Sequence, residues 1–347
     1  MIFKEMTDNQ RRVFIDTVQL HEAFVSAFNK NLSYRGGMHW KKSKSREYLF
    51  RSRDRFGYGK SLGPRSPETE KILTEFQQNK QRGKKRLSAL KDRLKEQSRF
   101  CRAALIQRVP RIVSGILRLL DQKNMLGRNV IVIGTNAIYA YEAFASVFFD
   151  ISTMATKDMD ILWDIRPKLT LFSENDMDND GLLGIIRKAD RSFEPINPGG
   201  FRAVNHDGYM VDLIKSAPKQ LLKKEVGRMG GPGDLEAVEI RNLQWLISSP
   251  KFSQVVIGDD GYPAPLVVPD PRAFALHKLW LSEQADREPV KKQRDCDQGL
   301  AVAQLIIQYL PNYHFKTSDL RMFPKDVVRR AKERISYIDL PVGINEK

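Results

Sequence analysis

From residue 111 onward, short apolar segments of strand length alternate with segments of helical periodicity, which constrains the fold more than any other feature. Asp207-Gly208 lies between the last two of these predicted strands and is typical of a tight hairpin turn. We therefore expect an α+β fold, a mixed β-sheet with flanking helices. The predicted helices cover residues 112–120, 137–148 and 181–189, and the predicted strands 129–133, 158–163, 201–205 and 209–214.

The rest of this half of the chain becomes increasingly helical. Asp259-Asp260-Gly261 predicts a second hairpin, between residues 254–257 and 265–268. Helices are expected near 272–285, 288–310 and 317–337. We divide the chain into a basic N-terminal region (1–110), a mixed α/β region (111–270) and a helical C-terminal region (271–347).

Positive charge is concentrated in the first third of the chain. Residues 30–65 carry eleven Lys and Arg against two acids, and residues 66–110 carry twelve against five. These two segments account for the whole net charge of +16, so the remaining residues are balanced. Such an asymmetry indicates a polyanionic partner at one end of the molecule.

The same N-terminal region has recognisable local signals. Residues 1–29 have the spacing of an amphipathic helix, and residues 33–63 alternate in the manner of a twisted two-stranded hairpin. Ser66 followed by Pro67 predicts the start of a long helix that runs to about residue 107, with an interruption near Gly83.

Aromatic and basic side chains are interleaved in the predicted hairpin. This pattern suits stacking on unpaired bases together with neutralisation of phosphates. The alternative is an ordinary hairpin, with aromatic rings in a core and cations that protect an exposed edge. The candidate nucleic-acid residues are Trp40, Lys41, Lys42, Lys44, Arg46 and Tyr48.

Several protein classes are excluded by composition. Two cysteines cannot form a disulfide framework and fit a reducing compartment. The apolar runs are too short to cross a bilayer, and the N-terminus lacks the apolar core of a secretory signal. We expect a cytoplasmic protein without a membrane partner.

Three features of the α/β region together indicate a chemical site. The strand at 129–133 ends in Gly134-Thr135 and leads into a helix, a turn where backbone N–H groups and a hydroxyl can meet a phosphate. Asp158 and Asp160 share one face of a strand, close enough to hold a divalent cation. Asp212 is a single acid within an apolar strand of the next hairpin.

In this order, the turn, the D-x-D strand and the later acid resemble the DNA polymerase beta-like nucleotidyltransferase superfamily. The resemblance covers roughly residues 112–310 and is closest to bacterial nucleotidyltransferase-fold proteins of uncharacterised or toxin-like type. It departs from the usual pattern at the turn, where Thr135-Asn136 replaces the commoner Gly-Ser or Ser pair.

The resemblance implies a mechanism. Asp158 and Asp160 would hold two Mg²⁺ ions around a nucleoside triphosphate, and Asp212 would complete the metal site and help to deprotonate the attacking hydroxyl. Gly134 and Thr135 would contact the triphosphate. Toxin-type relatives carry a Lys on one downstream helix and a Lys/Arg-Asp pair on the next, which correspond here to Lys278, Lys292 and Asp295; the alternative is a solvated helix face with ordinary i,i+4 ion pairs.

The resemblance and the charge distribution lead to three hypotheses. The leading one is Mg²⁺-dependent transfer of a nucleoside monophosphate to a hydroxyl of RNA, particularly a tRNA end. A second keeps the chemistry but has a protein Ser, Thr or Tyr as the acceptor, with the basic region as a docking arm and an antitoxin-like protein as a further partner. A third is a nucleic-acid-binding protein of the same fold without catalysis.

Overall fold

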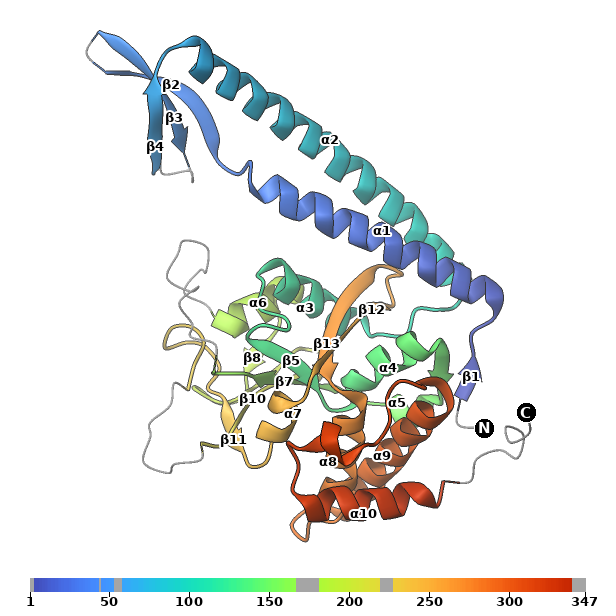
Figure 1. The fold of residues 1–347 in the computed structure, drawn as a ribbon. Helices are drawn as coiled ribbons and strands as arrows, with labels where there is room; N and C mark the ends of the chain where they lie inside the picture. Colours follow the sequence, from blue (N-terminus) through green and yellow to red (C-terminus); the bar gives the residue numbers. More distant parts are fainter. Residues whose placement is uncertain (1–2, 44, 53–57, 167–180, 219–226, 339–347) are drawn as a thin grey trace. The chain divides into compact units, whose positions relative to one another are not determined.

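The computed structural model describes residues 3–43, 45–52, 58–166, 181–218 and 227–338 (Figure 1). The chain forms two compact units. The mixed-sheet unit consists of Met1–Asp8, Gln107–Asp260 and Ala264–Lys347. The helical-hairpin unit consists of Asn9–Ile106 with Gly261–Pro263.

A mixed sheet forms the centre of the mixed-sheet unit, with strand order β5-β7-β10-β9-β8 and β11 also paired with β10. β7 and β10 run parallel, whereas β5 is antiparallel to β7 and β9 is antiparallel to β10. The strands are β5 (Val130–Ile133), β7 (Asp158–Trp163), β8 (Glu194–Pro195), β9 (Arg202–Val204), β10 (Met210–Ser216) and β11 (Val238–Ile240). This confirms the expected α+β class with a mixed sheet and flanking helices.

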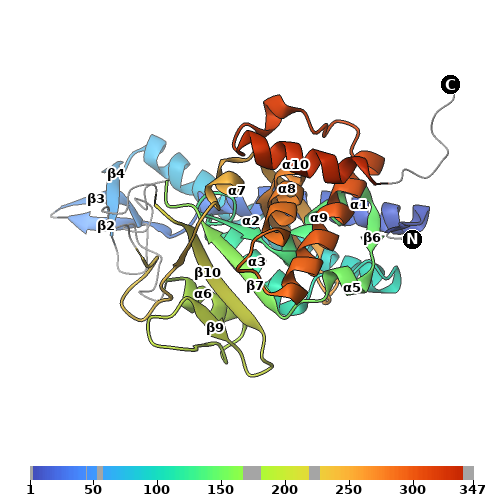
Figure 2. The same cartoon turned by 90° about the horizontal axis from the view of Figure 1, so that it is seen from below.

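Helices cover both faces of this sheet. Figure 1 shows α3 (Arg111–Gln122) and α6 (Gly181–Ala189) above the sheet and α8 (Pro271–Ser282) below it. α8 packs along α9 (Pro289–Tyr309) (Figures 1 and 2). Coverage of both faces explains why all four residues of β5 are buried and apolar rather than alternating.

Shorter elements complete the mixed-sheet unit. β1 pairs antiparallel with β6, and β12 pairs with β13 as the predicted second hairpin. The elements are β1 (Phe3–Glu5), η1 (Thr135–Ala137), α4 (Ile138–Ala145), β6 (Val147–Phe149), α5 (Ile151–Met154), α7 (Gln244–Ser248), β12 (Lys251–Ile257), β13 (Pro263–Pro269), η2 (Thr317–Leu320) and α10 (Lys325–Ser336).

The helical-hairpin unit consists of two long helices and a small sheet. α1 and α2 pack through Leu20, Ala27, Leu90 and Leu94, which are buried. The sheet has the order β2-β3-β4, with antiparallel pairing throughout. The elements are α1 (Asp8–Leu32), β2 (Gly37–Ser43), β3 (Arg46–Ser52), β4 (Gly59–Pro64) and α2 (Pro67–Ala103).

The structure corrects three predictions for the N-terminal region. The helix expected over residues 1–29 begins only at Asp8, because Phe3–Glu5 pairs with β6 as strand β1. The predicted two-stranded hairpin has a third strand, β4, whose Lys60 and Ser61 pair with β3. α2 is not interrupted near Gly83, because the helical hydrogen bonds continue through this glycine. The predicted start of α2 is confirmed: Ser66 accepts from the N–H of Thr69, whose hydroxyl accepts from the N–H of Ser66.

Two predicted helices of the mixed-sheet unit are shorter than expected. The segment 137–148 ends as a helix at Ala145, because Ser146 is left-handed (φ 55°) and the chain enters β6. The segment 317–337 is divided into η2 and α10 by Pro324, which cannot donate a helical hydrogen bond.

The expected division at residues 110 and 270 stays a prediction, although the two units bear on it. Residues 264–347 belong to the same compact unit as the sheet, and so do residues 1–8, where β1 pairs with β6. Within the described residues, none of the helices has the length and apolar character needed to cross a membrane.

Candidate active site

Three neighbouring strands bring the predicted carboxylates together. Asp160 in the middle strand β7 is paired on one side with Ile133 of β5 and on the other with Asp212 of β10. Asp158 lies two residues earlier on β7 and therefore on the same face as Asp160. The strand register thus gathers Gly134, Asp158, Asp160 and Asp212 at one place.

Gly134 is required by its backbone conformation and by its close contact with Asp160. Its φ is 66°, a region that residues with a Cβ rarely adopt. A Cβ at this position would also overlap with Oδ2 of Asp160. The turn is therefore built around the carboxylate, and any side chain here would displace it.

Asp160 has the most perturbed acidity of the site. Burial, followed by the negative charges of Asp158 and Asp212, raises its pKa to about 7. The cations Lys278 and Arg202 counteract this effect in part. The three carboxylates therefore repel one another around Asp160, and a bound cation would reduce this repulsion.

Asp212 is neutralised by an arginine from the neighbouring strand. Arg202 of β9, the register partner of Asp212, donates from Nε (2.7 Å) and Nη2 (2.6 Å) to the two carboxylate oxygens. Asp212 is 5% exposed, so this bidentate pair compensates a buried charge. While the pair is intact, both carboxylate oxygens of Asp212 accept from Arg202 and are less available to a metal ion.

Asp158 is held by its neighbours on both its side chain and its main chain. The Thr156 hydroxyl donates to the Asp158 carboxylate. Asn136 Nδ2 and the Tyr209 hydroxyl both donate to the Asp158 carbonyl oxygen, at 2.6 and 3.1 Å. Asn136, the departure from the usual turn sequence, therefore anchors the D-x-D strand to the turn.

Thr135 has a hydroxyl whose two acceptor positions are both used. Arg294 Nη2 (2.9 Å) and Gln298 Nε2 (3.1 Å), both from α9, donate to Thr135 Oγ1. A hydroxyl has two lone pairs and one proton, so the proton is left to be donated elsewhere. Within the described residues, no hydrogen bond uses it.

The predicted downstream residues differ in their relation to the carboxylates. Lys278 of α8 is close enough to lower the pKa of Asp160, and its Nζ is 2.7 Å from Oδ1 of Asp295. Asp295 also accepts from Arg287 (2.8 Å), so it positions two cations. In the part of the chain that the structure describes, the Lys292 side chain joins none of these groups by a hydrogen bond or ion pair, and its role stays a prediction.

His277, next to Lys278, is not a proton-transfer group in this site. Burial, with the charge of Lys278, lowers its pKa to about 3, so the ring is neutral. It packs between the rings of Trp245 and Trp280. This arrangement is that of a core histidine.

Sequence reasoning missed Arg202, Arg294 and Gln298. The spacing of Arg294 and Gln298 places both on one face of α9, a signal that was available but did not identify Thr135 as their target. Arg202 could have been predicted as the cross-strand partner of Asp212 by counting outward from the His206-Asp207-Gly208 turn.

The donor chemistry of the site suits a hard divalent cation, since carboxylate oxygens are the ligands that Mg²⁺ prefers. The raised pKa of Asp160 is the observation that supports this fit. Within the described residues, however, no three His, Cys, Asp or Glu side chains are grouped closely enough to hold a metal ion. Asp158 and Asp160 fit as they stand, and Asp212 would join them after leaving Arg202.

The candidate nucleic-acid residues lie on β2 and β3. Trp40 and Tyr48 are half-buried, and the Arg65 guanidinium lies 5.2 Å from the centre of the Trp40 ring. Lys41, Lys42 and Arg46 are exposed. Lys44 lies outside the described residues. Nucleic-acid contact by this strand pair stays a prediction.

Comparison with known proteins gives a family match that covers the carboxylate site. A family model described as Nucleotidyltransferase matches residues 111–323, which include the turn, all three carboxylates and α8 and α9. Neither a curated protein nor a solved structure matches the chain. Because the family model spans more than half of the sequence, the chain belongs to the nucleotidyltransferase family and is a transferase.

Proposed function

We propose that this enzyme transfers a nucleoside monophosphate from a nucleoside triphosphate to a hydroxyl group of RNA, in particular at a tRNA end, and releases pyrophosphate. The observation that carries the proposal is the strand register that sets Asp158, Asp160 and Asp212 beside the Gly134 turn. Phosphoryl-group chemistry depends mainly on positioning and charge neutralisation, which such an arrangement provides.

The triphosphate is bound by the turn and by α8. Thr135 donates its free proton to a phosphate oxygen, while Arg294 and Gln298 fix the orientation of the hydroxyl. Lys278, held by Asp295, supplies positive charge near the reacting phosphate. The two buried groups that contact the substrate, the Thr135 hydroxyl and the Lys278 ammonium, are thus each held in position by other side chains.

Asp158 and Asp160 would hold Mg²⁺, and two such ions stabilise both the entering and the leaving oxygen of an in-line displacement when bound. Asp212 accepts the proton of the attacking hydroxyl once it has separated from Arg202. The negative charges of Asp158 and Asp160 help to hold Arg202 at the site, so a cation held by these two carboxylates would weaken the attraction between Arg202 and the site.

RNA is favoured as the acceptor by the distribution of charge. The segments 30–65 and 66–110 hold the whole net charge, and β2 and β3 contain both cations and aromatic residues. Phosphates and unpaired bases are the ligands that match this combination. A protein hydroxyl makes no comparable demand for positive charge.

The test is incubation with each α-³²P-labelled nucleoside triphosphate, Mg²⁺ and either total RNA or total protein. Label in RNA that depends on Asp160 supports the proposal, and a size of tRNA supports the tRNA end. Label in protein alone would replace the RNA acceptor with a Ser, Thr or Tyr hydroxyl. Label in neither fraction would contradict the proposed reaction.

A further inference from the structure

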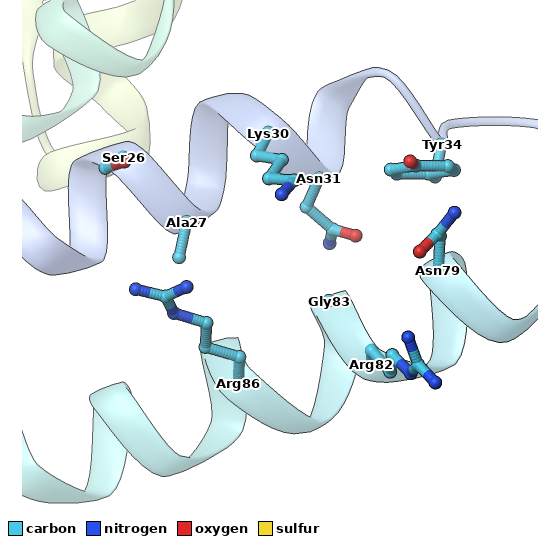
Figure 3. Close-up of a pocket in the computed structure, with 9 residues that line it drawn as sticks. All are labelled: Ser26, Ala27, Lys30, Asn31, Tyr34, Asn79, Arg82, Gly83 and Arg86. Carbon is cyan, nitrogen blue, oxygen red and sulfur yellow. The ribbon is translucent and has the colours of Figure 1, made fainter.

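A pocket of about 230 Å³ lies between α1 and α2, within the helical-hairpin unit (Figure 3). The carboxylates of the candidate active site belong to the other unit. The pocket is also distinct from the predicted nucleic-acid residues on β2 and β3, none of which lines it. Nothing in the proposed transfer reaction uses it.

Three cations line the pocket: Lys30 from α1 and Arg82 and Arg86 from α2 (Figure 3). Within the described residues, none of the three side chains makes a hydrogen bond or an ion pair. Residues 76–91 of α2 contain six Lys and Arg and no acid that could neutralise them. The pocket therefore attracts an anion, and Arg in particular matches a phosphate group.

The uncharged polar residues of the pocket suit a planar polar group. The amides of Asn31 and Asn79 are directed into the space between the helices, and the ring of Tyr34 lies beside Asn79 (Figure 3). Tyr34 is supported by Phe76, with ring centres 5.7 Å apart. An amide offers both donors and an acceptor to the edge of a base, and a Tyr ring offers a surface for stacking.

Gly83 of α2 leaves space for the Asn31 amide within the pocket. A Cβ at Gly83 would lie 2.7 Å from Oδ1 of Asn31, so a larger residue would push this amide aside. Glycine within a helix costs stability relative to alanine. Its presence here keeps the Asn31 amide available to a ligand.

We propose that this pocket binds a single nucleotide, whose phosphate is attracted by the positive charge of Lys30, Arg82 and Arg86 and whose base contacts Asn31, Asn79 and Tyr34. The nucleotide is either a free monophosphate or one unpaired residue of a strand.

Binding is measured by fluorescence anisotropy on the full chain without Mg²⁺, with a labelled ten-nucleotide single-stranded RNA of mixed sequence as the probe. The pocket variant Lys30→Gln/Arg82→Gln/Arg86→Gln is compared with the control Lys84→Gln/Lys85→Gln/Lys91→Gln, which loses the same charge from α2 outside the pocket. We expect the pocket variant to weaken binding at least about tenfold more than the control. Equal losses in the two variants would overturn the proposal.

Gly83→Ala tests the pocket without a change in charge. It should weaken binding severalfold while the thermal midpoint is retained or raised, since alanine is the better helix former. Wild-type affinity in this variant would overturn the proposal, because the cations would then act only as surface charge.

Competition between the RNA probe and free nucleoside monophosphates shows whether the bound nucleotide is free or part of a strand, and which base is preferred. Displacement by at least one of AMP, CMP, GMP and UMP indicates a site for the free monophosphate, and binding of RNA without such displacement indicates a nucleotide within a strand. Both results support the proposal. Inorganic phosphate that competes as well as every monophosphate would overturn base recognition and leave a simple anion site.

Discussion

In the mixed-sheet unit, the buried carboxylate of Asp212 is paired with one cation and that of Asp295 with two. In the helical-hairpin unit, by contrast, Lys30, Arg82 and Arg86 line an open pocket without an ionic partner in the described residues. The difference follows from solvation. A buried charge without a partner destabilises the folded state, whereas an exposed cation is solvated by water and needs no ionic partner before a ligand binds. In the mixed-sheet unit the charged side chains are therefore held in fixed ion pairs, whereas in the helical-hairpin unit the pocket cations remain available to bind a ligand.

The largest effect is expected from removing the charge of Asp160. Asp160→Asn keeps the side-chain volume but removes a carboxylate from the centre of the site, so nucleotidyl transfer should fall by roughly a thousandfold or more. Incorporation of labelled nucleotide into RNA measures this. Asp207→Asn, an exposed carboxylate in the β9–β10 turn, is the control that keeps activity. Unchanged transfer by Asp160→Asn would show that Asp160 does not belong to the active site.

The second prediction concerns the pH dependence of stability. The pKa of Asp160 is raised from 3.8 to about 7, so the folded state binds the proton more tightly than the unfolded chain does. Without metal, the contribution of Asp160 to the free energy of unfolding should therefore be largest below about pH 4. It should decline as the pH rises to about 7, by up to about 4 kcal/mol.

Urea unfolding of wild type and Asp160→Asn between pH 4 and pH 8 measures this contribution. The variant should lack most of the decline. Parallel pH profiles of the two proteins would show that Asp160 has an ordinary pKa and that the carboxylates are not crowded.

The third prediction separates buried from exposed ion pairs. Arg202→Gln leaves Asp212 buried without its partner, and unfolding free energy should fall by about 1–3 kcal/mol, less than for a fully buried pair because Arg202 is one third exposed. Arg65→Gln, which removes two exposed ion pairs, with Glu47 and Glu70, in the other unit, should change the thermal midpoint little.

The double variant Arg202→Gln/Asp212→Asn completes this comparison, since it removes both charges. It should recover much of the stability lost in Arg202→Gln. Failure to recover would mean that Arg202 stabilises the sheet by packing rather than by neutralising Asp212.

The fourth prediction concerns the Thr135 hydroxyl. Thr135→Val keeps the shape but removes a proton available to phosphate, so nucleotide affinity should weaken by roughly tenfold to a hundredfold, or about 1.5–3 kcal/mol. Thr135→Ser, which retains a hydroxyl, should lie near wild type. Isothermal titration with each triphosphate measures both, and equal affinities for Val and Ser variants would make Gly134-Thr135 a packing turn only.

The smallest effect on the catalytic chemistry is expected from the basic strands. Replacing Lys41, Lys42, Lys44 and Arg46 by Gln should flatten the salt dependence of RNA binding, because fewer counterions are released. Hydrolysis of the triphosphate should not change. Titrations at low and moderate salt measure the slope, and identical slopes for variant and wild type would exclude these strands from RNA binding.

Local signals predicted many elements of the fold from sequence. β7 and α6 have the predicted bounds, because each begins and ends where its apolar periodicity does. The misjudged elements depended on distant contacts: β4 is a strand through its pairing with β3. Gly83, which suggested an interruption of α2, instead provides space beside Asn31 of α1.

The sequence by itself determined the chemistry available to this protein: a glycine turn, a D-x-D strand, a later acid and a basic N-terminal third. Only the tertiary structure decided which charges are compensated. The pairing of β9 with β10 gives Asp212 its arginine, and the packing of α9 brings Arg294 and Gln298 to Thr135. The physical reason is that the energy of a buried charge depends on neighbours that are far away in sequence and close in space.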